Sequence, residues 1–243
     1  MISRETDRSH VAWDIETTGF SWNDKITVCG FWFPAGHATL LLNAESSPSV
    51  EGRVFEERLE LLTDDLTVRI QVCPDEHDLL ESLHDVVFEQ FDTEYNRLIA
   101  FNADSWQGGF DLPFLRMRCL ANDYPWVFEG MQFCDLWDPV KKRINTTCTT
   151  YDTTTDVNTL VGSHNIIFKE YSNTALGDST EYMPYRDNPY DPFDDSGNAV
   201  YSYKRGEYMP ILKHNLADVQ RTWELGEVVR QFVPGKDITT KKL

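Results

Sequence analysis

The chain has 243 residues, of which 41% are hydrophobic, and it contains seven Trp, ten Tyr and fourteen Phe, so its composition excludes a disordered protein. No apolar run reaches the length of a membrane span, and the N-terminus MISRETDRSH lacks the apolar core of a secretion signal. A formal net charge of −18 argues against a surface that binds nucleic acid mainly through its own basic residues. We expect a soluble, cytoplasmic protein.

The first part of the chain predicts three strands that follow one another in antiparallel order. They cover residues 10–17, Ile26–Phe33 and Ala38–Leu42, and short turns rich in Gly, Asn, Asp and Pro separate them. A short helical pattern follows near Val54–Leu62, and Val68–Val72 has the alternation of another short strand.

A longer helix begins at Pro74-Asp75-Glu76 and carries apolar residues at helical spacing up to Phe91. Arg97–Asn102 is a compact apolar strand, and a glycine-containing loop leads from it to a helix over about residues 112–120. Gly130–Leu136 has the pattern of the next strand.

The remaining segments alternate between polar stretches and helices. The threonine-rich segment 145–155 predicts an irregular structure, and Val157–Phe168 predicts a helix. Residues 172–206, rich in Tyr, Asp, Asn and Pro, predict a long loop insertion. The last strong element is a helix over Met209–Phe232. With no internal repeat and no linker, residues 1–243 predict one α/β domain, in which helices flank a mixed five-stranded sheet whose first three strands are antiparallel.

The acidic residues are spread along the chain, with 40 Asp and Glu against 22 Lys and Arg. In a halophile's cytoplasm multimolar salt shortens the Debye length to below about 3 Å, so an acidic surface repels itself less. A basic partner protein is the alternative explanation, but the diffuse bias favours the halophile. The five cysteines include no CxxC pair, which indicates reduced thiols in the core.

The stretch VAWDIETTGF places two carboxylates, Asp14 and Glu16, within an otherwise apolar strand. Residues two apart in a strand face the same side, so both carboxylates converge on one spot. Charges at the end of a core strand are costly unless something compensates them.

Two helices carry further acidic residues. In FNADSWQGGFDLPFLRMR, Asp111 stands at or just before a helix N-terminus, where an aspartate by itself is more often a helix cap than a metal ligand. In KHNLADVQRTWEL, His214 and Asp218 are four residues apart and therefore neighbours on one helix face. Each motif is weak alone, but their order along the chain is specific.

Taken together, DIETTGF, FDLPFL and HNLAD resemble the three motifs of the DEDD superfamily of 3′–5′ exonucleases, which have a ribonuclease H-like fold. The first two motifs are most similar to those of the proofreading exonuclease domain of family B DNA polymerases. The resemblance covers roughly residues 9–230, and implies a stand-alone domain from a haloarchaeon or a halophile's virus.

The resemblance implies a two-metal site. The four carboxylates that match the family's ligands would hold two divalent ions, Mg²⁺ or Mn²⁺; they are Asp14, Glu16, Asp111 and Asp218. His214 would complete the catalytic set by deprotonating or orienting the attacking water. Expected substrate-binding residues are Thr17, Thr18, Asn102, Trp106 and Phe110.

The chain departs from the family at two points. Most members with this third motif have Tyr four residues before the Asp, and another branch has His five before it, whereas here His214 stands four before Asp218. The family's Asn usually lies only a few residues before Phe-Asp, but here Asn102 stands eight before Phe110. The inserted residues carry Trp106, which could stack on a terminal base or pack on its own protein.

The expected activity is hydrolysis of single-stranded or frayed DNA from the 3′ end, with DNA replication or repair proteins as partners. Two alternatives stay open. One is a 3′–5′ exoribonuclease, because no sequence feature distinguishes RNA from DNA by its 2′-hydroxyl. The other is a non-catalytic nucleic-acid-binding or polymerase-accessory module. Candidate phosphate contacts are few and include Arg116, Arg118 and Lys141-Lys142-Arg143.

Overall fold

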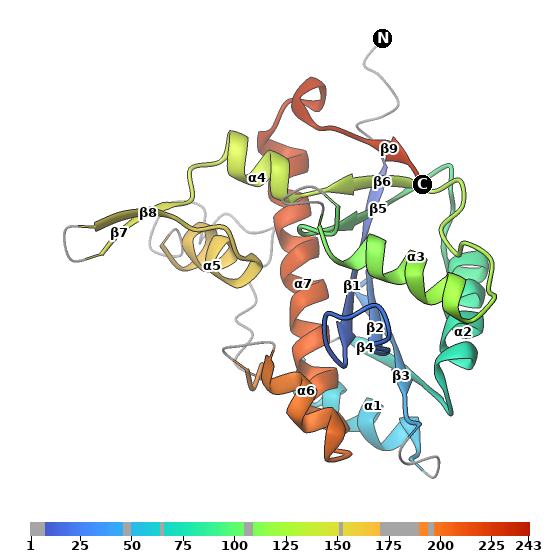
Figure 1. Ribbon diagram of the computed structural model, residues 1–243. Helices are drawn as coiled ribbons and strands as arrows, with labels where there is room; N and C mark the ends of the chain where they lie inside the picture. Colours follow the sequence, from blue (N-terminus) through green and yellow to red (C-terminus); the bar gives the residue numbers. More distant parts are fainter. Residues whose placement is uncertain are drawn as a thin grey trace.

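Figure 1 shows the computed structural model of the chain. It describes residues 8–45, 50–63, 66–104, 109–150, 153–170, 190–193 and 197–243. Within these residues the chain forms a mixed seven-stranded sheet, in the order β4-β3-β2-β1-β5-β6-β9, and a separate β7–β8 hairpin. The sheet strands are β1 (Ser9–Thr17), β2 (Ile26–Phe33), β3 (His37–Asn43), β4 (Thr67–Cys73), β5 (Asn96–Ala100), β6 (Gln132–Asp135) and β9 (Lys241–Lys242).

Seven α-helices accompany these strands in the described residues. They are α1 (Gly52–Glu60), α2 (Glu76–Gln90), α3 (Asp111–Ala121), α4 (Trp137–Arg143), α5 (Leu160–Asn165), α6 (Gly197–Lys204) and α7 (Tyr208–Phe232). A π-helical turn over Ile166–Glu170 continues α5, and a 3₁₀ turn over Gly235–Asp237 follows α7. None of these helices is both long and apolar enough to cross a bilayer.

The directions of the first three strands agree with the predicted antiparallel order. β1 pairs antiparallel with β2, and β2 pairs antiparallel with β3. β5 then lies parallel to β1 on its other side, and β6 lies parallel to β5. β1 is therefore a central strand, and its polar residues are held in the middle of the sheet.

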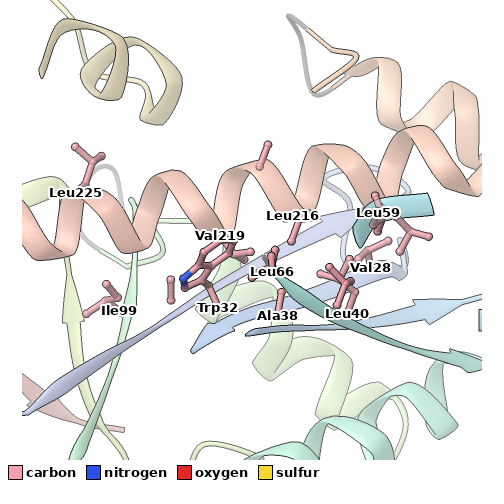
Figure 2. Packing of buried hydrophobic residues seen from close by; sticks show 14 of the residues in the cluster. Val28, Trp32, Ala38, Leu40, Leu59, Leu66, Ile99, Leu216, Val219 and Leu225 are labelled. Atoms are coloured by element: carbon pink, nitrogen blue, oxygen red, sulfur yellow. The ribbon is translucent and has the colours of Figure 1, made fainter. Parts of the chain in front are cut away.

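The alternation along β1 divides the core into two layers. Val11, Trp13 and Ile15 join the hydrophobic cluster formed with α2 and α3, whereas Ala12 joins the cluster formed with α7. Figure 2 shows the second cluster, in which Leu216 and Val219 of α7 lie over strand residues that include Trp32, Val28 and Leu40. Because side chains alternate along a strand, Asp14 and Glu16 face the α7 side as Ala12 does.

The predicted sheet of five strands was too small. β4 pairs in parallel with β3 and extends one edge, while β9 pairs antiparallel with β6 and extends the other. β9 is only two residues long, and so short a polar segment carries no alternation that a sequence pattern could detect.

The threonine-rich segment was wrongly predicted to be irregular. Thr147–Thr150 (β7) and Thr153–Asp156 (β8) form an antiparallel hairpin, which Figure 1 shows projecting away from the sheet. β-Branched threonines favour extended backbone even without an apolar face. The predicted insertion at 172–206 also contains structure, because α6 occupies Gly197–Lys204; most of its remainder lies outside the described residues.

The cysteines behave as expected where they are described. Cys29, Cys73, Cys119 and Cys134 are free and buried, and the side chain of Cys148 lies outside the described part of the structure.

Candidate active site

A pocket of about 190 Å³ opens between β1, the start of α3, and helices α6 and α7. Its lining comprises Asp14, Ile15, Glu16, Thr17, Gly19, Phe20, Phe110, Asp111, Gly197, Val200, His214 and Asp218. All four predicted carboxylates and the predicted histidine thus line one pocket, although they come from segments up to about 200 residues apart.

Asp111 reaches the pocket because of a tight turn before α3. Gly109 has a φ of +64°, and a Cβ at this position would lie only 2.2 Å from the Asp104 backbone nitrogen, so only glycine fits. The Leu112 N–H then donates to the Ala103 carbonyl at 3.2 Å, which ties the start of α3 to the end of the β5 segment. Asp111 is the first residue of the helix, not its cap.

α7 contributes His214 and Asp218 from one face, as their spacing predicted. The His214 side chain is 5% exposed, with Nε2 3.7 Å from Asp218 Oδ2 and 3.9 Å from Glu16 Oε1. On the other side of the ring, Nδ1 lies 2.9 Å from Asp191 Oδ1. His214 is therefore buried between carboxylates instead of being exposed on the helix.

Three residues that were absent from the predicted site set, Asn215, Arg221 and Asp191, hold the site in place. Asn215 Nδ2 donates to Asp14 Oδ2 at 2.9 Å. Arg221 Nη1 donates to Asp218 Oδ1 at 2.7 Å and to Asp191 Oδ2 at 2.5 Å. Asn215 and Arg221 lie three residues before and after Asp218, so helical spacing was an available signal; Asp191, in an acid-rich loop, had none.

Repulsion and burial raise the pKa values of the clustered carboxylates. Burial, followed by the charges of Glu16, Asp111 and Asp218, raises the pKa of Asp14 well above its ordinary value. Burial raises the pKa of Glu16 to about 8, and neighbouring aspartates add to this effect while His214 opposes it. Burial and neighbouring aspartates also raise the pKa of Asp111 to about 8. This pocket needs positive charge to ionise fully at neutral pH.

His214 supplies part of that charge. Burial alone would lower its pKa, but the hydrogen bond to Asp191 and the charges of Asp218 and Glu16 outweigh burial and raise the pKa to about 9. Burial would raise the pKa of Asp191, yet the bonds to His214 and Arg221 lower it. In the absence of bound cations, His214 keeps its proton at pH 7 and Asp191 is a carboxylate.

The donor set fits divalent cations. Carboxylate oxygens are the ligands that Mg²⁺ and Mn²⁺ favour, and the four carboxyl groups that line this pocket repel one another when they are ionised. One ligand atom each from Glu16, His214 and Asp218 lie within 4.8 Å of one another, close enough to share an ion.

The predicted substrate-binding residues divide into three groups. Thr17 and Phe110 line the pocket. Thr18 does not line it and instead donates to Asp24 Oδ1 at 2.9 Å, while Asn102 lies in the turn after β5, where its N–H donates to Asp135 Oδ1 at 2.9 Å. Trp106 lies outside the described residues.

An aromatic residue absent from the predicted set stands at the pocket mouth. Phe20 is 82% exposed and packs edge-to-face on Phe110, with ring centroids 5.3 Å apart. The sequence feature that could have identified Phe20 was its position directly after TTG in the first motif.

The expected basic contacts are engaged within the protein. Arg118 is buried, with Nη2 2.6 Å from Glu76 Oε2, and Lys142 pairs with Asp138 on the surface of α4. Asp135 is the buried last residue of β6, and its carboxylate accepts backbone N–H groups near the end of β5 and at the start of α4. Basic side chains therefore contribute little positive charge to the pocket beyond Arg221 and His214.

The sequence matches no protein-family model and no curated protein significantly. The fold is similar to part of the family B DNA polymerase from the hyperthermophilic archaeon Pyrobaculum calidifontis, with a TM-score of 0.51 and 17% sequence identity. The match covers 90% of this chain and 24% of the polymerase chain. The likeness therefore concerns the fold of a segment that is about a quarter of the polymerase.

Proposed function

We propose that the protein is a metal-dependent 3′–5′ exonuclease that removes nucleotides from single-stranded or frayed DNA ends. The observation that carries the proposal is the convergence of Asp14, Glu16, Asp111 and Asp218 on one pocket. The fold's similarity to part of a DNA polymerase supports nucleic acid as the substrate class and the proofreading exonuclease domain as the matching segment.

Asp14, Glu16, Asp111 and Asp218 would hold two divalent ions, Mg²⁺ or Mn²⁺. When bound, such ions supply a nucleophilic water and neutralise the charge that develops on the scissile phosphate. The protein's own charge of −18 would otherwise repel a polyanion.

The chain's residues would orient the reacting groups. Asn215 fixes the Asp14 carboxylate and Arg221 fixes that of Asp218, so each carboxylate keeps one oxygen free of these bonds. Phe20 and Phe110 at the mouth offer aromatic faces and edges on which an unpaired terminal base could stack. Base stacking of this kind favours single strands, because a paired base is already stacked in its duplex.

The experiment that tests this proposal follows 5′-labelled single-stranded DNA, duplex DNA and RNA with Mg²⁺ or Mn²⁺ at several KCl concentrations. A ladder that shortens from the 3′ end, and stops when a chelator is added, is the expected result. Asp14→Ala should abolish it. Asp138→Ala is the matched control, because Asp138 pairs with Lys142 outside the pocket.

Two results would contradict the proposal. The first is degradation by Asp14→Ala at the rate of the unchanged protein. The second is binding of single strands with no cleavage under any metal, which would indicate a non-catalytic module. Faster degradation of RNA than of DNA would make the protein an exoribonuclease.

A further inference from the structure

The His214 ring is fixed in one orientation. Its Nδ1 lies 2.9 Å from Asp191 Oδ1, and the other Asp191 oxygen accepts from Arg221. Because an ionised carboxylate only accepts hydrogen bonds, Nδ1 is the donor in this pair. Phe193 packs edge-to-face on the ring, with centroids 5.4 Å apart. Nε2 is therefore the nitrogen that faces Glu16 and Asp218.

The distances from Nε2 to the two nearest carboxylate oxygens are too long for hydrogen bonds, but they suit atoms that bind the same ion. Nε2 lies 3.7 Å from Asp218 Oδ2 and 3.9 Å from Glu16 Oε1, whereas hydrogen bonds span roughly 2.7–3.2 Å. Two atoms that each lie about 2.0–2.2 Å from one ion are at most about 4.4 Å apart. The three ligand atoms lie within 4.8 Å of one another, so small movements of the side chains would let one ion contact all three.

Two of the surrounding side chains, Asp218 and Asp191, are held by Arg221. Arg221 holds Asp218 through Oδ1, which leaves Oδ2 on the His214 side. Asp191 uses one oxygen for His214 and the other for Arg221, and its side chain is 4% exposed, so it supports the site from behind. A carboxylate that accepts from the far nitrogen of a histidine is the usual support of a metal-bound imidazole.

We propose that His214 is itself a metal ligand, which binds through Nε2 one divalent cation shared with Glu16 and Asp218, and that Asp191 is its positioning residue. The imidazole nitrogen makes this position prefer Mn²⁺, Co²⁺ or Zn²⁺ over Mg²⁺, because Mg²⁺ favours oxygen ligands. The inference rests on the proposed nuclease site, and it states which class of divalent ion one of the two metal positions prefers. It assigns His214 a role different from that of a proton acceptor for water.

Pulsed electron paramagnetic resonance of the Mn²⁺-loaded protein tests the inference without any activity measurement. A directly bound imidazole gives a ¹⁴N modulation, which we expect in the unchanged protein. His214→Gln should lose it, and His84→Gln should keep it, because His84 is an exposed residue of α2 that does not line the pocket. Asp191→Asn should weaken Mn²⁺ binding about 10–100-fold.

Calorimetric titrations add a second measurement. The ratio of Mn²⁺ to Mg²⁺ affinity should fall at least about tenfold in His214→Gln and stay unchanged in His84→Gln, with circular dichroism to verify folding.

Mn²⁺ binding without ¹⁴N modulation in the unchanged protein would overturn the inference and leave the proposed nuclease intact, with His214 free to act on water. Failure of the protein to bind any divalent ion would overturn both. Nitrogen modulation together with no cleavage of any nucleic acid would support the inference and contradict the nuclease.

Discussion

Gly30 lies directly opposite Asp14 in the β1–β2 pair, and the space above it is filled by Asn215. A Cβ on Gly30 would lie 2.0 Å from Asn215 Oδ1 and 2.9 Å from Leu40 Cδ2. The missing side chain on β2 therefore allows α7 to approach closely enough for Asn215 to donate to Asp14 at 2.9 Å. A glycine within an otherwise apolar strand thus has a function in the site.

Gly30→Ala should displace the Asn215 amide and release Asp14. We expect a loss of about 1–3 kcal/mol in the free energy of unfolding, from overpacking, and a fall in degradation rate of about 10-fold or more. Thermal unfolding and the 5′-labelled DNA assay measure the two effects.

A double-mutant cycle separates this mechanism from general damage to the strand. Asn215→Ala makes room for the new methyl group, so Gly30→Ala should cost much less in that background than alone. Additive effects of the two substitutions would show that Gly30 does not act through Asn215.

The metal-free protein should lose stability as pH rises from about 5 to about 9. Glu16 and Asp111 have pKa values raised to about 8, from ordinary values of 4.5 and 3.8, and His214 has one raised to about 9, from 6.5. The folded state therefore binds more protons than the unfolded chain across this window, and the stability that these groups contribute is lost as pH rises through their folded values. Asp191 has a lowered pKa and titrates below the window.

Thermal unfolding in a chelator, at half-unit pH steps, measures this loss. We expect the midpoint to fall by several degrees, and Mn²⁺ to restore it at pH 8, because cations replace the protons. Glu16→Gln should flatten the profile. A midpoint that stays constant or rises between pH 5 and 9 would be inconsistent with the clustered charges.

Phe20→Ala should weaken substrate binding without destabilising the fold. Phe20 is 82% exposed and lines the pocket mouth, so its removal costs little packing. Base stacking on an aromatic ring contributes roughly 1–3 kcal/mol, so KM for single-stranded DNA should rise about 5–150-fold. Phe88→Ala is the matched control, because Phe88 is 81% exposed and lies on α2. Equal KM values for the two variants would exclude stacking on Phe20.

The buried Glu76–Arg118 pair should be a main determinant of stability near the β1–β2 turn. Glu76 Oε1 also accepts the Ile26 N–H at 2.8 Å, and Arg118 Nη1 donates to the Trp22 carbonyl at 3.1 Å. Glu76→Ala leaves a buried charge without its partner and should cost about 3–5 kcal/mol in urea unfolding. Glu57→Ala, which breaks an exposed pair with Arg53, should cost less than about 1 kcal/mol. Similar costs would contradict this assignment.

Some features of the fold could be predicted because they depend on local patterns. Alternation predicted β1, a continuous apolar run between two turns predicted β2, and helical spacing predicted α2, α3 and α7, with ends within about two residues of the observed ones. The β7–β8 hairpin and β9 were missed, because a threonine-rich strand and a two-residue strand lack an apolar face. β9 is stabilised by pairing with β6, which lies far away in the sequence, so no local pattern reveals it.

Two neighbouring pairs of the site could be predicted from the sequence. Asp14 and Glu16 are two apart in a strand, and His214 and Asp218 are four apart in a helix, so their shared faces follow from backbone periodicity. The side chains that surround these pairs depend on tertiary packing. Asp191 reaches His214 from 23 residues away, and Asn215 reaches Asp14 from 201 residues away. Contacts at such separations depend on how helices pack on the sheet, and this packing turns His214 from an ordinary helix residue into a buried, oriented ring.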